Sequence, residues 1–205
     1  MSVRKAPQNH RKQDLDSILP LFPKEAQYYF CSPNSSRGLS TEILQNEAKK
    51  YDLIGEKYDS VEIAFAEAKK KDIGIIARVP LASGLLTGKF DSKTTFDTQD
   101  HRNFNRNGEA FDKGETFSGI DYNLGLKAVE ELKALFPETT NLAPIALQWI
   151  LSFSEVSCII PGTSTESHVL SNLSTFDLPA LTPEKIAAMN EIYNHYIKKE
   201  VHHLW

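Results

Sequence analysis

Two segments of the sequence combine residues that could bind a phosphate. The first is the run LASGLLTGK at 81–89, which directly follows the apolar run IGIIARVP at 73–80. Ser83 and Gly84 would let backbone amides approach a ligand closely, and Lys89 would add a positive charge nearby. In parallel α/β folds, ligands bind at the carboxyl ends of the strands, where this segment would lie. Glycine after a strand also serves as a simple turn, and these residues alone leave both interpretations open.

The second segment is VSCIIPGTSTESHVLSN at 156–172, in which Gly162 follows an apolar run. Thr163 and Glu166 have the spacing of a capping box, which predicts the start of a helix. The free amides and the dipole at a helix start favour a bound anion, although a merely well-capped helix is the alternative. Both segments occur in one chain, in the order in which barrel folds use such loops for phosphate. We therefore favour a ligand that carries a phosphate.

The rest of the chain alternates between segments typical of strands and of helices. Four segments have the composition of strands: 26–32, 57–63, 73–80 and 156–160. The last two are apolar runs, which predicts strands buried on both faces and a buried, reduced thiol at Cys158. Helices are expected at 41–51 after an N-cap at Ser40, at 65–72, at 124–136, at 144–153 with Pro144 in the first turn, and from Thr182 onward.

This order is that of βα units around a parallel sheet. A closed (β/α)8 barrel, or TIM barrel, needs eight strands and about 250 residues, so the sequence predicts an α/β fold with half a barrel. Residues 1–39 are expected to form an irregular N-terminal segment, and residues 40–205 the half-barrel. The polar stretch 91–121 is expected to be a long loop, which in a compact domain is usually functional or mobile.

Composition excludes several classes of function. The chain has 205 residues, 40% hydrophobic and 24% charged, with a net charge of -4, so we expect neither nucleic acid nor a membrane as partner. No apolar stretch follows the basic first residues, and the two cysteines have no metal-ligand spacing, so we expect a protein of the reducing cytoplasm. The histidines show no ligand spacing with carboxylates, so no metal site is expected.

Three longer segments resemble the aldo-keto reductase family, in the branch that includes potassium-channel β subunits and many bacterial reductases. They are RVPLASGLLTGKF at 78–90, DHRNFNRNGEAFDKGETFSGID at 100–121 and ALQWILSFSEVSCIIPGTSTESHVLSN at 146–172. The resemblance extends over about residues 40–205 and corresponds to the C-terminal half of the family's barrel. It implies a C-terminal half-barrel that binds NADP.

The resemblance also implies particular binding residues. The backbone of Pro80, Leu81, Ser83 and Gly84 would face the pyrophosphate of NADP, and Lys89 would approach the cofactor phosphates.

Further residues follow from the long loop and from the second segment. Arg102 would also approach the phosphates. Gly162 and Ser164 fall where the family binds the adenosine 2′-phosphate, and His168 and Asn172, one helical turn apart, fall where it holds the adenine.

The chain departs from the family's pattern at several positions. Many members have a basic residue where Ser164 stands, and because a hydroxyl is a weaker partner for an anion, NAD stays an alternative to NADP. His168 replaces the family's usual glutamine, with an exposed helix position as the alternative interpretation. The run after Val61 continues directly into a helix, and Ile63 cannot replace the aromatic residue that stacks on the nicotinamide.

No catalytic residue is assigned. The family's aspartate, tyrosine, lysine and histidine come from the first half of the barrel, which this chain does not contain. Two functions stay open: an NADP-dependent reductase of small carbonyl compounds, or a nucleotide-binding or interaction protein without catalysis. Because a half-barrel would have open strand edges, we expect either a homo-oligomer or a complementary half-barrel chain as partner.

Overall fold

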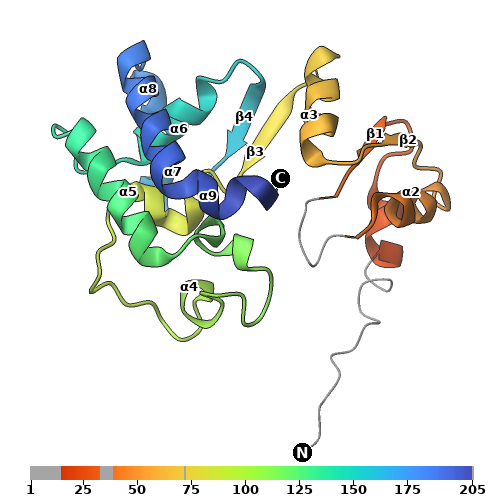
Figure 1. Cartoon of the computed structure of the whole chain (residues 1–205), viewed down its shortest axis with the longest axis horizontal. Coiled ribbons are helices and arrows are strands. Elements are labelled where there is room, and N and C mark those ends of the chain that lie inside the picture. The colour runs from red at the N-terminus through yellow and green to blue at the C-terminus, as the bar shows by residue number, and fades with distance from the viewer. Residues whose placement is uncertain (1–14, 33–38, 72, 205) are drawn as a thin grey trace, which may run out of the picture. The chain divides into compact units, whose positions relative to one another are not determined.

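The structure is a computed structural model that describes three stretches of the chain: 15–32, 39–71 and 73–204 (Figure 1). They form two compact units, which we call unit 1 and unit 2, with the boundary between residues 70 and 71. The division expected from the sequence, with a half-barrel over residues 40–205, stays a prediction.

Unit 1 is built on a parallel pair of short strands. β1 (Tyr28–Phe30) is hydrogen-bonded to β2 (Gly55–Lys57), and α2 (Thr41–Lys49) connects them. The Ser40 hydroxyl accepts a hydrogen bond from the Ile43 amide at 3.2 Å, which confirms the predicted N-cap of α2. The hydrophobic core of unit 1 contains four buried residues: Leu19, Phe30, Ala48 and Leu53.

Two expectations for unit 1 are wrong. The strand expected at 57–63 ends at Lys57, and α3 (Val61–Lys70) begins within it. The reason is a helix cap: the Ser60 hydroxyl accepts a hydrogen bond from the Ile63 amide at 3.1 Å, which favours a helix start over a strand. Residues 15–21, expected to be irregular, are helical, because this stretch contributes to the hydrophobic core of unit 1.

Unit 2 contains the second pair of strands. β3 (Ile75–Arg78) and β4 (Val156–Ile160) are parallel neighbours, with Ile76 opposite Cys158 and Arg78 opposite Ile160. Both strands lie within the ranges that the sequence predicts. Their parallel pairing brings together the segments that follow them, although the two strands lie far apart in the chain.

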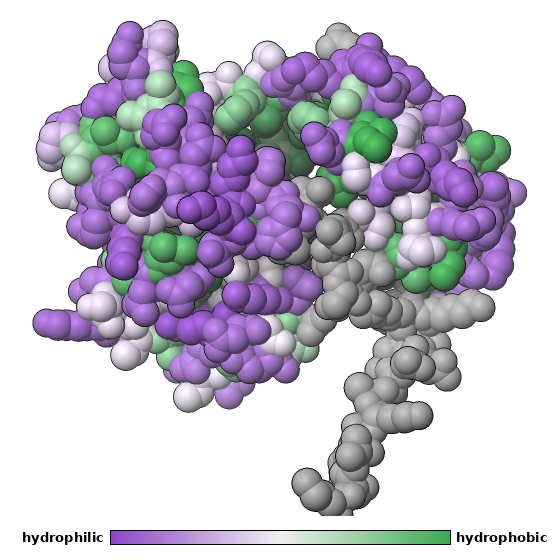
Figure 2. Space-filling model, in the orientation of Figure 1, coloured by the Kyte–Doolittle hydropathy of each residue, from purple (hydrophilic) through white to green (hydrophobic). Residues whose placement is uncertain are grey.

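The expected burial of these strands is wrong. Ile76 is 59% exposed and Ile160 is 56% exposed, and Cys158 is also exposed rather than buried. The physical reason is that the described sheet of unit 2 has only two strands, so each strand has one edge without a neighbouring strand. Exposed hydrophobic side chains form green patches on an otherwise mainly purple surface (Figure 2).

The helices of unit 2 supply its core. Their bounds are α4 (His101–Phe104), α5 (Tyr122–Leu135), α6 (Ala143–Leu151), α7 (Glu166–Leu173), α8 (Pro183–Ile192) and α9 (Lys198–Val201). Val129 and Phe136 are buried, as their helical spacing predicts, and Pro144 lies in the first turn of α6. Thr182 caps α8 by accepting a hydrogen bond from the Lys185 amide, which confirms the predicted start of this helix.

The long stretch 91–121 is irregular, as expected, but it is packed into unit 2. It contains α4 and two 3-10 turns, Lys113–Glu115 and Phe117–Gly119. The Phe117 ring is 1% exposed and belongs to the core. The long loop therefore contributes to the hydrophobic core of unit 2.

The fold class is mixed α/β, as predicted. The four strands of the described residues form two separate parallel pairs, one in each unit. The arrangement of all four in one half-barrel stays a prediction. No helix among the described residues has the length and apolar character needed to cross a bilayer.

Candidate functional site

A polar cleft of about 570 Å³ lies in unit 2, at the carboxyl ends of β3 and β4. Its walls come from the segment after β3, the start of the long loop, the start of α6, and α7 with the segment before it. Every residue that the sequence singled out for cofactor binding lines this cleft: Pro80, Leu81, Ser83, Gly84, Lys89, Arg102, Gly162, Ser164, His168 and Asn172. The structure thus brings the two predicted segments together, while what they bind stays a prediction.

The backbone after β3 follows an unusual path. Val79, Ala82 and Ser83 have φ angles of 52°, 47° and 56°, in the left-handed region that few residues other than glycine adopt. The long loop holds this path in place. The Ser83 hydroxyl donates to the Glu115 carbonyl at 3.2 Å and accepts from the Phe117 amide at 3.3 Å. Such strain persists only where the surrounding structure enforces it, and it is concentrated at functional sites.

The two predicted cations of the cleft, Arg102 and Lys89, differ in whether an acidic side chain of the described residues pairs with them. The Arg102 guanidinium pairs with the Asp100 carboxylate, with Nη2 at 2.5 Å from Oδ2, and lies 4.6 Å from the centre of the Phe96 ring. Lys89 is exposed, and the structure shows no ion pair between it and another described residue. Lys89 is therefore the better candidate to neutralise a bound phosphate, whereas Arg102 shapes the cleft wall.

The pair of Asp100 and Arg102 predicts a dependence of stability on pH. Hydrogen bonding to the Arg102 guanidinium lowers the pKa of Asp100 from 3.8 to about 2. Because the folded state has the lower pKa, this stabilisation is complete above about pH 4 and is lost as the pH falls to about 2. Its size should be about 1–2 kcal/mol, since the two side chains are 21% and 27% exposed and water screens them in part.

Asp100→Asn is the matched test, because asparagine can still cap α4 as Asp100 does. We expect urea unfolding to show this variant less stable by about 1–2 kcal/mol at pH 6, and equal to the wild type near pH 2. An equal loss of stability at both pH values would mean that the charge is unimportant.

α7 begins in a different way from the capping box that the sequence predicts. Its N-cap is Thr165 rather than Thr163, and the Thr165 hydroxyl accepts a hydrogen bond from the His168 amide at 3.3 Å. The two residues before Thr165 are thereby left outside the helix as part of the cleft wall. The Ser164 hydroxyl lies 3.3 Å from Nδ1 of His168, so the two side chains border the same point of the cleft.

Two features of the second segment leave room for a ligand. A Cβ atom placed on Gly162 would meet no atom within 4 Å, so the cleft is open at this position. The side-chain nitrogen of Asn172 is buried and has no hydrogen-bond acceptor among the described residues. A buried donor without a partner is costly, and such groups often mark a site where a missing acceptor binds.

The cleft also contains residues that the sequence analysis missed, among them His101, Asn141 and Ser171. Asn141 donates to the Ser171 hydroxyl at 2.8 Å and so links the start of α6 to α7. These residues reach the cleft only through the packing of distant segments. No local pattern in the sequence could have indicated them.

The side chain of His101 lies between those of Ser83 and Asp100, as the histidine of a catalytic triad lies between its serine and its aspartate. The geometry of the three side chains does not support a triad. Nε2 of His101 is 3.4 Å from the Ser83 hydroxyl, and Nδ1 is 3.6 Å from Asp100. The Ser83 proton is donated to the Glu115 carbonyl, and Asp100 is already paired with Arg102. A serine nucleophile needs its base within hydrogen-bond reach and its proton available to that base.

The lining of the cleft contains two histidines, His101 and His168, and one lysine, Lys89. Among the residues that line it, there is no tyrosine, aspartate or glutamate. The described residues also contain no group of three histidine, cysteine or acidic side chains that could hold a metal ion.

The model of the aldo/keto reductase family matches residues 36–194, and the chain belongs to this family. It is 31% identical over 122 residues to a probable voltage-gated potassium channel subunit beta of Oryza sativa subsp. japonica, covering 56% of this chain and 33% of that protein. It is also 31% identical over 134 residues to an aldo-keto reductase of Strobilurus tenacellus, covering 64% of this chain and 37% of the relative.

Solved structures of the same family are also similar to the chain. A glycerol dehydrogenase from Gluconobacter oxydans matches with a TM-score of 0.49 and 24% identity, over 65% of this chain and 38% of that structure. An aldo-keto reductase from Bacillus halodurans matches with a TM-score of 0.44 and 18% identity, over 80% of this chain and 48% of that structure. The chain thus spans about a third of the length of the curated relatives that it matches.

Proposed function

We propose that the cleft of unit 2 binds NADP(H), as the nucleotide-binding part of an aldo-keto reductase. The observation that carries this proposal is the convergence of every predicted binding residue on one polar cleft. Its volume of about 570 Å³ lies within the range of about 300–1,000 Å³ that is typical of ligand and cofactor sites. When bound, the nicotinamide cofactor would supply a hydride.

The residues fit the parts of a dinucleotide phosphate. The strained backbone around Ser83 would border the pyrophosphate, and the cation of Lys89, which has no ion-pair partner among the described residues, would offset its charge. Ser164, beside the open space at Gly162, would contact the adenosine 2′-phosphate, and His168, whose ring lies 3.3 Å from the Ser164 hydroxyl, would border the adenine. Asn172 has the buried donor that the adenine could satisfy. Because Ser164 is uncharged, NAD is the second cofactor that the cleft could accept.

The reaction that we propose for the whole protein is reduction of a small aldehyde or ketone. The chain itself supplies the nucleotide site, and we assign none of its residues to catalysis. The groups that carry out catalysis would be supplied by residues other than those that line the cleft. The exposed apolar side chains Val169, Leu170 and Leu173 on α7 support association with another protein surface.

We propose the reducing cytoplasm as the location of the protein, in keeping with the exposed thiol of Cys158.

A nucleotide-binding protein without catalysis is the second candidate function. The observation that favours it is the absence of tyrosine and carboxylate side chains from the lining of the described cleft. Saturable NADPH binding without turnover of any aldehyde or ketone would support this candidate over the reductase.

A fluorescence titration with NADPH tests the proposal. We expect saturable binding by the wild type, and affinities reduced about 10-fold or more by Lys89→Ala and by Ser164→Ala, because each removes one contact to a phosphate. Lys93→Ala is the matched control, since Lys93 is exposed in the same loop and does not line the cleft. A parallel titration with NADH would measure the preference between the two cofactors.

Two results would contradict the proposal. The first is the absence of NADPH binding by protein whose circular dichroism shows it to be folded. The second is binding that Lys89→Ala and Ser164→Ala leave as strong as Lys93→Ala does, since the nucleotide would then lie elsewhere.

A further inference from the structure

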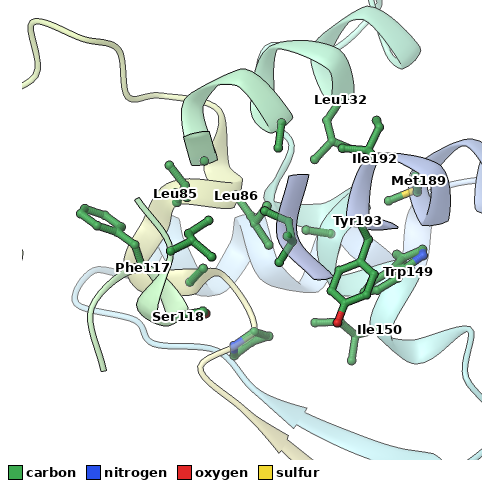
Figure 3. Close-up of a pocket in the computed structure, with 17 residues that line it drawn as sticks. Leu85, Leu86, Phe117, Ser118, Leu132, Trp149, Ile150, Met189, Ile192 and Tyr193 are labelled. Atoms are coloured by element: carbon green, nitrogen blue, oxygen red, sulfur yellow. The ribbon is translucent and has the colours of Figure 1, made fainter. Parts of the chain in front are cut away.

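A second hollow in unit 2 lies against the hydrophobic core and is partly open to the solvent. Figure 3 shows the side chains that converge on it, which come from the turn after β3, from α5, α6 and α8, and from the helical turn after α8. Its volume is about 200 Å³. An engineered apolar cavity of about 150 Å³ in another protein binds benzene.

The lining of this hollow is almost entirely hydrocarbon. Leu85 and Phe117 are buried in its wall, and Leu132, Trp149 and Met189 complete its sides. An apolar molecule would lose contact with water here and gain dispersion contacts with these side chains.

Of the three polar side chains that line the hollow, those of Trp149 and Tyr193 have partners within the protein, and the Ser118 hydroxyl is the third polar group. The indole nitrogen of Trp149 donates to Asn190 at 3.3 Å, and the Tyr193 hydroxyl lies 2.9 Å from Nδ1 of His202. A polar molecule would therefore exchange its hydrogen bonds with water for few new ones, which is unfavourable. The lining thus selects for a ligand without charge.

A change in helical geometry forms part of the wall. α8 ends at Ile192, and the chain continues as a π-helical turn, Tyr193–Ile197. Ile192, Tyr193 and Ile197 all line the hollow. π-helical turns are rare and occur frequently at functional sites. The π-helical turn in this wall therefore supports a role in binding.

The hollow adjoins the polar cleft. Pro80 lines both, and Ala82, with its φ of 47°, lines the hollow on the same strained segment. We propose that the hollow is a binding site for a small apolar molecule of about six to ten carbon atoms. This site is separate from the nucleotide cleft and does not depend on the function proposed for that cleft.

The test uses p-xylene as the probe and Trp205→Phe as the background, so that Trp149 is the remaining tryptophan. We expect a saturable change in Trp149 fluorescence, and a Tm raised by about 3–6 °C at a tenfold excess of probe over its Kd. Glycerol, which is polar, should change neither quantity at the same concentrations.

Matched variants locate the site. Ala146→Leu, in the α6 wall, should fill the hollow and weaken p-xylene binding at least about 10-fold. Ala187→Leu, exposed on α8 and outside the hollow, should leave binding unchanged. Ala128→Leu, in the α5 wall, is the second filling variant and decides the result if Ala146→Leu does not fold.

The proposal is overturned if folded protein shows no saturable response to p-xylene, or if glycerol gives the same response. It is also overturned if a folded filling variant binds the probe as tightly as Ala187→Leu does.

Discussion

Gly162→Trp is expected to abolish NADPH binding without loss of stability. A side chain at this position would meet no atom of the protein within 4 Å of its Cβ and would extend into space that the cleft now leaves open. The indole would occupy the place proposed for the adenosine phosphate, and no displacement of the core is needed to hold it. We expect affinity for NADPH to fall about 100-fold or more, which corresponds to about 2.7 kcal/mol.

Gly162→Ala is the control for this variant. A methyl group there touches nothing within 4 Å, so affinity and stability should both stay close to those of the wild type. Fluorescence titration gives the affinities, and urea unfolding confirms that both variants are folded. Wild-type affinity in folded Gly162→Trp would show that the nucleotide does not occupy this cleft.

Asn105→Ala is expected to cause the largest loss of stability. The Asn105 side chain is fully buried in the long loop and makes four hydrogen bonds. Its amide nitrogen donates to the Asp112 carbonyl and the Thr116 hydroxyl, and its oxygen accepts from two backbone amides, those of Ala110 and Phe111. Alanine would leave these groups without partners in a closed interior. We therefore expect the free energy of unfolding to fall by about 3–5 kcal/mol.

Asn103→Ala provides the comparison for Asn105→Ala. Asn103 is exposed in the same loop and makes one side-chain hydrogen bond, to the Phe96 carbonyl at 2.8 Å, so its loss should cost less than about 1 kcal/mol. Urea unfolding measures both values. Similar small effects from the two variants would mean that the loop contributes little to the stability of unit 2.

The loss of Asn105 should also weaken nucleotide binding in protein that stays folded. The same loop supplies the Glu115 carbonyl and the Phe117 amide that hold Ser83 in its strained conformation. If the loop loosens, the backbone around Ser83 is free to relax to a commoner conformation, and its amides would no longer point in fixed directions.

The sequence by itself determined part of the candidate site. The resemblance to the aldo-keto reductase family supplied most of the predicted cleft residues, whereas Ser83, Gly84, Lys89 and Gly162 could also be predicted from the ends of two apolar strands followed by glycine and small polar residues. This was possible because parallel strands that are neighbours place their carboxyl ends together. Helix starts at Ser40, Pro144 and Thr182 were equally predictable, since caps depend on residues within one turn.

Only the tertiary structure decided how these residues are surrounded. The pairing of Arg102 with Asp100 leaves Lys89 as the unpaired cation of the two predicted ones, and the identical charges in the sequence give no sign of this difference. The exposure of Cys158 and Ile76 depends on how many strands and helices cover the sheet. An apolar run in the sequence indicates only that its side chains tend to be buried. The apolar hollow is likewise invisible in the sequence, because a void is set by the packing of several distant helices rather than by any one segment.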